Sequence, residues 1–124
     1  MAVKITLSIF CALALVSSTC YSGSTERTHY TPIQYLKNYA LSSCIADGYQ
    51  SKDVVSDATA AANGYKELGS LGIDAYNEAS DLGQKFLAKE YMSQGGEKLI
   101  LMKCIDFYHS KELDRLARKF AAKK

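Results

Sequence analysis

Apolar residues recur three and four positions apart along most of this 124-residue chain. That spacing puts them on one face of an α-helix, whereas a half-buried strand alternates apolar and polar residues. No convincing alternation occurs, and Pro32 is the one proline in the sequence. Because proline interrupts helices, its scarcity agrees with the spacing. The pattern predicts an all-α fold, a small bundle of about five helices.

Turn-forming residues divide the pattern into five predicted helices. Thr31 followed by Pro32 is typical of an N-cap and a first helical position, and Ser110 is a second predicted N-cap. The spacing of the fourth helix places Leu101, Cys104, Ile105 and Tyr108 on one shared face. The predicted helices are residues 32–48, 53–65, 74–91, 97–108 and a last one that follows Ser110.

The N-terminal segment is typical of a secretory signal peptide. Lys4 precedes a nearly continuous apolar run at residues 5–16, and small polar residues follow at 17–19. The run is shorter than the roughly 20 residues that a membrane-spanning helix needs. We therefore expect residues 1–23 to be a signal peptide, residues 24–124 to form one helical domain, and the processed chain to be exported without a membrane anchor. Lipidation of Cys20 is an alternative, disfavoured because residues 17–19 lack the expected large aliphatic residue.

Four cysteines are present, and two of them lie in the predicted mature domain. Cys11 and Cys20 fall in the predicted signal peptide, which leaves Cys44 and Cys104. Two cysteines in an exported chain predict one disulfide. A bridge closing about 60 residues would stabilise the fold by roughly 4 kcal/mol on the chain-entropy model. Two buried free thiols are the alternative.

Side chains suited to catalysis are few and badly placed. His29 and His109 are the two histidines. Cys104 and His109 are five positions apart, so they face different sides of a helix and make a poor nucleophile and base. Asp106, His109 and Glu112 are spaced by three, but a structural zinc site usually has four cysteine or histidine ligands. We predict no catalytic residue, no metal and no cofactor.

Charge and tyrosine content bear on the expected partners. The formal net charge is +2, from 15 basic and 13 acidic residues, whereas nucleic-acid binding usually draws a dense basic patch. Nine tyrosines are present and no tryptophan. Most of these tyrosines are predicted to surround the core, while Tyr76 and Tyr91, which flank turns, are predicted to contact a protein partner.

Three stretches of the sequence resemble a known family. They are LKNYALSSCIA at 36–46, GYKELGSLGIDAYNE at 64–78 and MKCIDFYHSKELDRLARKF at 102–120. Together they resemble the immunity proteins of the fourth family of type VI secretion amidase effectors. The resemblance implies a periplasmic, all-helical homodimer that binds a cognate peptidoglycan amidase as a heterotetramer with two effector chains. It also leads us to expect proline at the position of Gly72, so the turn there is expected to be looser.

The resemblance further implies that a protruding loop enters the amidase's catalytic groove. We place this loop at the Gly95-Gly96 pair, where the clearest turn signal lies. Its residues are Tyr91, Met92, Ser93, Gln94, Gly95, Gly96 and Glu97. The alternative loop consists of Leu68, Gly69, Ser70, Leu71, Gly72, Ile73 and Asp74. Two other functions are weighed against inhibition: a periplasmic helical adaptor or ligand carrier, and a secreted enzyme or toxin.

Overall fold

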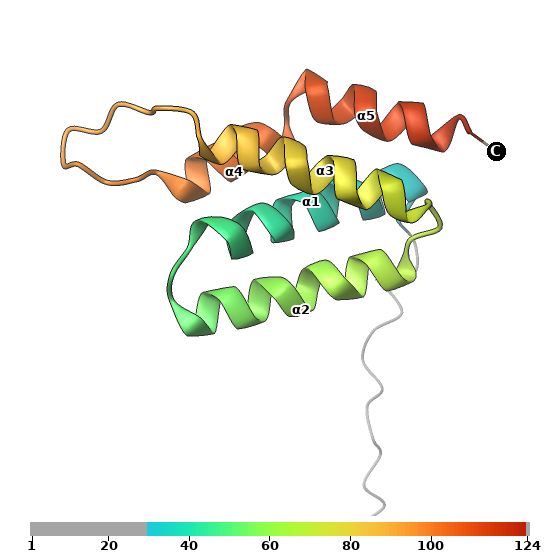
Figure 1. Ribbon diagram of the computed structural model, residues 1–124, viewed down its shortest axis with the longest axis horizontal. Coiled ribbons are helices and arrows are strands. Elements are labelled where there is room, and N and C mark those ends of the chain that lie inside the picture. Colours follow the sequence, from blue (N-terminus) through green and yellow to red (C-terminus); the bar gives the residue numbers. More distant parts are fainter. Residues whose placement is uncertain (1–29, 124) are drawn as a thin grey trace, which may run out of the picture.

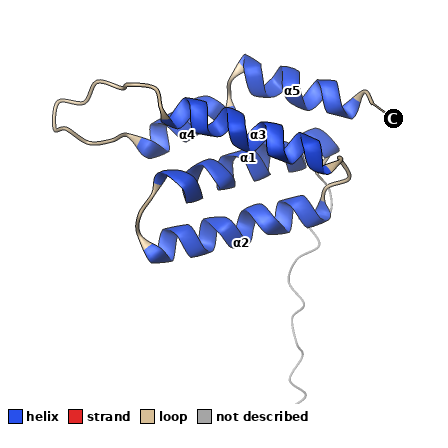
Figure 2. Ribbon diagram, in the orientation of Figure 1, coloured by secondary structure: helices blue, strands red, loops and turns tan. Residues whose placement is uncertain are grey.

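The computed structural model describes residues 30–123, and this part of the chain contains helices and no strand (Figure 2). In chain order the helices are α1 (Pro32–Gly48), α2 (Lys52–Leu68), α3 (Ile73–Leu87), α4 (Ile100–Tyr108) and α5 (Lys111–Ala121). The predicted all-α fold is confirmed. The predicted signal peptide, with Cys11 and Cys20, lies outside the described residues, and so does His29.

Helix α1 lies at the centre of the bundle and packs against each of the other four helices (Figure 1). Helix α2 lies on one side of α1, and α3 contacts both α4 and α5 on the other. Alanines at the contacts allow the helix axes to approach closely, and larger side chains fill the centre. The core consists of Leu36, Ala40, Cys44, Ala75, Tyr76, Ala79, Phe86, Cys104, Phe107, Leu113 and Ala117.

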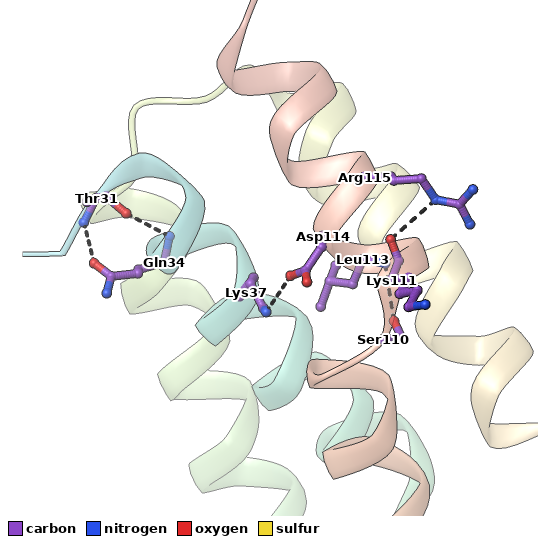
Figure 3. Close-up of polar contacts among 8 residues, drawn as sticks. All are labelled: Thr31, Gln34, Lys37, Ser110, Lys111, Leu113, Asp114 and Arg115. Atoms are coloured by element: carbon purple, nitrogen blue, oxygen red, sulfur yellow. Dashed lines mark hydrogen bonds and ion pairs between the residues drawn. The ribbon is translucent and has the colours of Figure 1, made fainter.

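Two helices begin at the predicted caps. The Thr31 hydroxyl accepts a hydrogen bond from the Gln34 backbone N–H (3.2 Å), and the Gln34 side chain accepts one from the Thr31 N–H (2.8 Å; Figure 3). Pro32 occupies the first turn. The Ser110 hydroxyl accepts from the Leu113 N–H at 3.1 Å. These bonds satisfy backbone donors that a helix start otherwise leaves unpaired.

A disulfide joins α1 to α4 through Cys44 and Cys104, as predicted. The two Cα atoms are 5.7 Å apart, within the usual range for this bond, and both residues are buried. The alternative of two free thiols is wrong. The bridge therefore links the central helix α1 to α4. Helix α4 directly follows the longest connection of the described chain, residues 88–99.

Ion pairs hold α5 against its neighbours. Lys37 on α1 contacts Asp114 on α5, with Nζ 2.6 Å from Oδ1 (Figure 3). This contact holds the pKa of the Asp114 carboxyl below its usual value. Lys119 pairs with Glu78 on α3 at 3.0 Å. Both pairs lie partly in solvent, where such contacts stabilise a fold weakly, so the buried Leu113 and Ala117 supply most of the packing of α5.

Three predicted helix boundaries are wrong. Helix α2 continues to Leu68 through Asn63-Gly64, because the packing of its alanine face on α1 outweighs two poor helix formers. Helix α3 ends at Leu87 rather than at residue 91, although residues 88–90 are good helix formers. Helix α4 begins at Ile100 rather than at residue 97, since Leu99 takes a left-handed conformation with φ of 51°.

The apolar face predicted for α4 is buried only in part, at Cys104. Leu101 and Ile105 are 49% and 44% exposed. The buried face instead carries Lys103, Cys104 and Phe107. The disulfide fixes the rotation of this short helix, and Phe107 packs beside Phe86 of α3 with ring centroids 5.1 Å apart. Apolar spacing alone allowed either rotation, because both faces of α4 carry apolar residues.

Tyr76 is a core residue, so its predicted role at an interface is wrong. Its side chain is 2% exposed, and its ring packs edge-on against Tyr39 with centroids 5.0 Å apart. Its hydroxyl lies where a Cβ on Gly69 would stand, so glycine at 69 makes the close approach possible. Burial raises the pKa of the Tyr76 phenol.

Candidate functional site

The longest connection in the described chain is the segment between α3 and α4, residues 88–99. It extends beyond the ends of the helices as an open loop, here called the α3–α4 loop (Figure 1). A turn forms at Gln94-Gly95, and Gly96 follows with φ of 78°, a conformation that glycine adopts without steric strain. Met92 is 96% exposed. The loop therefore includes all of the predicted residues 91–97 and is longer than predicted.

Hydrogen bonds within the loop shape its tip. The Ser93 hydroxyl accepts from the backbone N–H groups of Gly95 and Glu97, both at 3.3 Å. The same hydroxyl donates to the Glu97 carboxylate. The bond from the Ser93 hydroxyl is the main cause that holds the pKa of the Glu97 carboxyl below its usual value, and the backbone N–H groups of Glu97 and Gly95 contribute to the same shift. The tip is thus a small hydrogen-bonded unit that carries a negative charge at neutral pH.

The base of the loop is anchored to α4 by two further contacts. Lys103 is 9% exposed, and its Nζ donates to the Leu87 carbonyl at 3.0 Å. This bond occupies a carbonyl that the end of α3 would otherwise leave unpaired, which explains why α3 stops there. The Tyr91 hydroxyl donates to Asp106 Oδ2 at 2.6 Å, and Lys103 Nζ lies 5.7 Å from the centre of the Tyr91 ring.

Replacing Tyr91 with phenylalanine is expected to loosen the loop without unfolding the bundle. The ring stays near Lys103, but the bond to Asp106 is lost; one such bond contributes about 1 kcal/mol. The bond and the Asp106 charge raise the pKa of the Tyr91 phenol, so the bond remains intact throughout the neutral range. Hydrogen exchange of the amides of residues 90–98 should accelerate in Tyr91→Phe, while exchange in α1 stays unchanged. Equal exchange in the loop of both proteins would contradict the anchoring role.

The alternative loop is a tight connection in the structure. Leu68 ends α2, Ile73 and Asp74 belong to the first turn of α3, and residues 69–72 alone lie outside the helices. Leu71 packs against the core cluster. Gly72 has φ of −66°, a value that proline also adopts, and a Cβ there would meet no atom within 4 Å. The backbone therefore follows the path that a proline at this position would allow.

The hollows of the described surface include the following two. The larger, of about 460 Å³, lies where the end of α1 meets the returning limb of the α3–α4 loop. Its lining residues are Gly48, Tyr49, Gln50, Glu97, Lys98, Leu99, Ile100, Leu101 and Met102. The smaller, of about 330 Å³, lies on α2 and is lined by Asp57, Ala60, Ala61, Gly64, Tyr65 and Leu68.

The sequence candidates for catalysis are not brought together. Cys104 is consumed by the disulfide, so it offers no thiol to His109. Asp106 accepts the Tyr91 hydroxyl, and the His109 ring lies against Tyr108. Within residues 30–123 no group of three histidine, cysteine, aspartate or glutamate side chains is arranged to hold a metal ion. The features that stand out are instead a shaped loop and its anchors.

Sequence reasoning missed the anchoring residues Lys103 and Asp106. Asp106 entered only as a possible metal ligand, and Lys103 was not considered. A signal existed, because Lys103 lies next to Cys104 on the face of α4 that the disulfide turns inward. A lysine on a buried helix face needs a partner, and the carbonyls at the end of a neighbouring helix are suitable acceptors.

A disulfide-linked helical bundle with a projecting, internally bonded loop has the rigidity and the shaped surface that suit a protein-binding scaffold. Residues 34–117 match the family model Tai4, described as type VI secretion system amidase immunity protein. The match spans more than half of the chain, and the chain belongs to this family. The resemblance seen in the sequence is confirmed, and with it the role in immunity against an amidase effector. A comparison with curated proteins finds no match.

Solved structures agree with this assignment. The chain is similar to one from the Tae4–Tai4 effector–immunity system of Salmonella typhimurium, at 36% identity and a TM-score of 0.70, covering 74% of this chain and 91% of that one. It is also similar to a chain from a study of type VI-secreted toxins and self-resistance proteins of Serratia marcescens, at 26% identity and 0.68, covering 75% and 77%. A Tae4–Tai4 complex from Enterobacter cloacae matches in fold, at 20% identity and 0.65, covering 73% and 92%.

Proposed function

We propose that this protein protects its cell by inserting the α3–α4 loop into the active-site groove of a type VI peptidoglycan amidase effector. The observation that carries the proposal is the loop itself, which projects from the bundle with Met92 96% exposed at its side. A single exposed apolar side chain is common on protein surfaces, but Met92 stands on a projecting loop, where the cleft of a partner can receive it. It is a suitable anchor for a partner's cleft.

The internal bonds of the loop favour this use. A flexible loop would have to be ordered on binding, which weakens the complex. Here Ser93 bonds to both sides of the tip, and Tyr91 and Lys103 fix its base. The loop therefore holds its shape before it meets the enzyme, and Gln94 and the Glu97 carboxylate are available to hydrogen-bond the walls of the groove. Obstruction of this kind requires no chemical change of a substrate, so we propose that the protein has no catalytic activity.

The setting that we propose for this activity is the periplasm. The signal-like sequence of residues 1–23 supports export, and a disulfide is favoured in that oxidising compartment. No helix of the described residues is long and apolar enough to cross a membrane. We further propose a homodimer that binds two effector chains.

An inhibition titration tests the proposed function. Purified protein is added to a candidate type VI amidase effector, and the release of peptide fragments from peptidoglycan is measured. Light scattering of the same mixture gives the mass of the complex. We expect cleavage to stop when the two chains are equimolar, and a complex with the mass of two copies of each. Undiminished cleavage at excess protein would contradict the proposal, whereas inhibition by a complex of one copy each would contradict only the stoichiometry.

A further inference from the structure

The outward face of α4 is unusually apolar. Leu101, Met102 and Ile105 are 49%, 52% and 44% exposed. Ile105 lies three positions from Met102 and four from Leu101, and positions so spaced are neighbours on a helix surface. Ile105 therefore joins the other two side chains into a single patch, here called the α4 patch. Of the seven large hydrophobic residues exposed in the described chain, these three and Met92 lie in α4 or in the loop that precedes it. Apolar exposure is thus concentrated at the loop-bearing end of the molecule.

The fold prevents α4 from burying this patch by rotation. Its other face holds Cys104, which is bonded to α1, and Phe107, which is fully buried. The end of α1 also packs tightly on the start of α4, since a Cβ on Gly48 would lie 2.3 Å from the Ile100 side chain. Leu101, Met102 and Ile105 consequently stay in solvent unless another protein covers them.

The larger hollow lies directly beside the patch. Leu101 and Met102 form part of its lining, together with Gly48 at the end of α1 and residues 49–50 of the α1–α2 connection. The remaining wall is the returning limb of the α3–α4 loop, including Glu97. Glu97 therefore belongs both to the hydrogen-bonded tip of the loop and to the edge of the hollow. The loop tip, the hollow and the α4 patch form one continuous surface.

We propose that the α4 patch and this hollow are a second contact surface for the effector that receives the loop, and that they bind an apolar segment at the rim of its groove. This inference rests on the proposed function, because continuity with the loop identifies the occupant: a protein that encloses the tip must meet the adjoining surface. The patch has an apolar centre. Glu97 and Lys98 adjoin it in the lining of the hollow, and the exposed Asp106 follows Ile105 on α4, so charges of both signs lie around it. Such a centre with a polar rim is typical of protein interfaces, and it offers no excess charge to a polyanion.

Substitutions on the patch separate this surface from the loop. Met102→Glu and Leu101→Glu are compared with Thr59→Glu, which adds the same charge at an exposed position on α2. Each full-length variant is titrated with the amidase effector by calorimetry, and the free variant is examined by light scattering and thermal unfolding. We expect each patch variant to bind the effector at least about tenfold more weakly. Thr59→Glu should bind as the unchanged protein does, and all three should unfold at nearly the same temperature.

The outcomes distinguish this inference from the proposed function. Weaker binding by the patch variants with an unchanged oligomeric state supports the second contact. If the patch variants bind normally while Met92→Glu binds poorly, the inference is overturned and the loop remains the inhibitor. If the patch variants alter the mass of the free protein, the patch is an interface between copies of this chain, and the inference is overturned. If the patch variants and Met92→Glu all bind normally, both the inference and the proposed function are overturned.

Discussion

Replacing Cys44 and Cys104 together with alanine is expected to lower the free energy of unfolding by about 4 kcal/mol. The bridge closes a loop with a sequence separation of 60 residues, and its loss returns that closure entropy to the unfolded chain. Domains of this size are stable by only about 5–15 kcal/mol, so the variant loses a large share of its stability. Urea unfolding followed by circular dichroism measures the change.

A reducing agent provides the matched control. Dithiothreitol should destabilise the unchanged protein to about the level of the double variant and leave the variant itself unaffected. That comparison separates the bridge from the small loss of packing that alanine causes, and from any effect on Cys11 and Cys20. Equal stability of the oxidised and reduced protein would show that the bridge contributes nothing to the fold.

Met92→Glu is expected to weaken binding to the amidase effector by about thirtyfold or more, which corresponds to about 2 kcal/mol. Met92 is 96% exposed, so the substitution removes almost no packing from the free protein and its unfolding temperature should not change. If residue 92 enters an apolar part of the groove, the complex has to bury the glutamate carboxylate away from water, which is unfavourable. Calorimetric titration and the inhibition of peptidoglycan cleavage measure the loss.

Ile73→Glu is the matched control and also tests the alternative loop. Ile73 is 60% exposed at the start of α3, where a carboxylate is favourable to the helix dipole. The substitution makes the same change from an apolar to an acidic side chain as Met92→Glu, but within the alternative loop, residues 68–74. Normal binding by Ile73→Glu with poor binding by Met92→Glu supports the α3–α4 loop. The reverse result would assign inhibition to the alternative loop.

The disulfide and the loop are connected through α4. Cys104 is bonded to α1, and the adjacent Lys103 donates to the Leu87 carbonyl at the end of α3. Asp106, on the exposed side of the same helix, accepts the Tyr91 hydroxyl. One short helix therefore both stabilises the bundle and fixes the base of the loop. This arrangement explains why a helix with so much apolar surface in solvent is held rigidly in place.

Local chemistry made much of the fold predictable. Thr31, Pro32 and Ser110 specify helix starts through backbone geometry and capping, which do not depend on distant residues. The cysteine pair followed from counting, and the position of the α3–α4 loop followed from Gly95-Gly96. The capping and turn signals act within a few residues, and two cysteines in the predicted mature domain allow only one pairing. Neither kind of signal needs a structure to be recognised.

The sequence by itself determined that the chain is helical, where most of its helices begin, and which two cysteines pair. Only the tertiary structure decided how α4 is rotated, where α3 stops and that Tyr76 is buried. The physical reason is that α4 carries apolar residues on both faces, so its own pattern leaves two rotations nearly equal. Contacts made across the chain, through Cys44, Phe86 and Leu87, select one of them. That selection leaves Leu101, Met102 and Ile105 in solvent beside the loop.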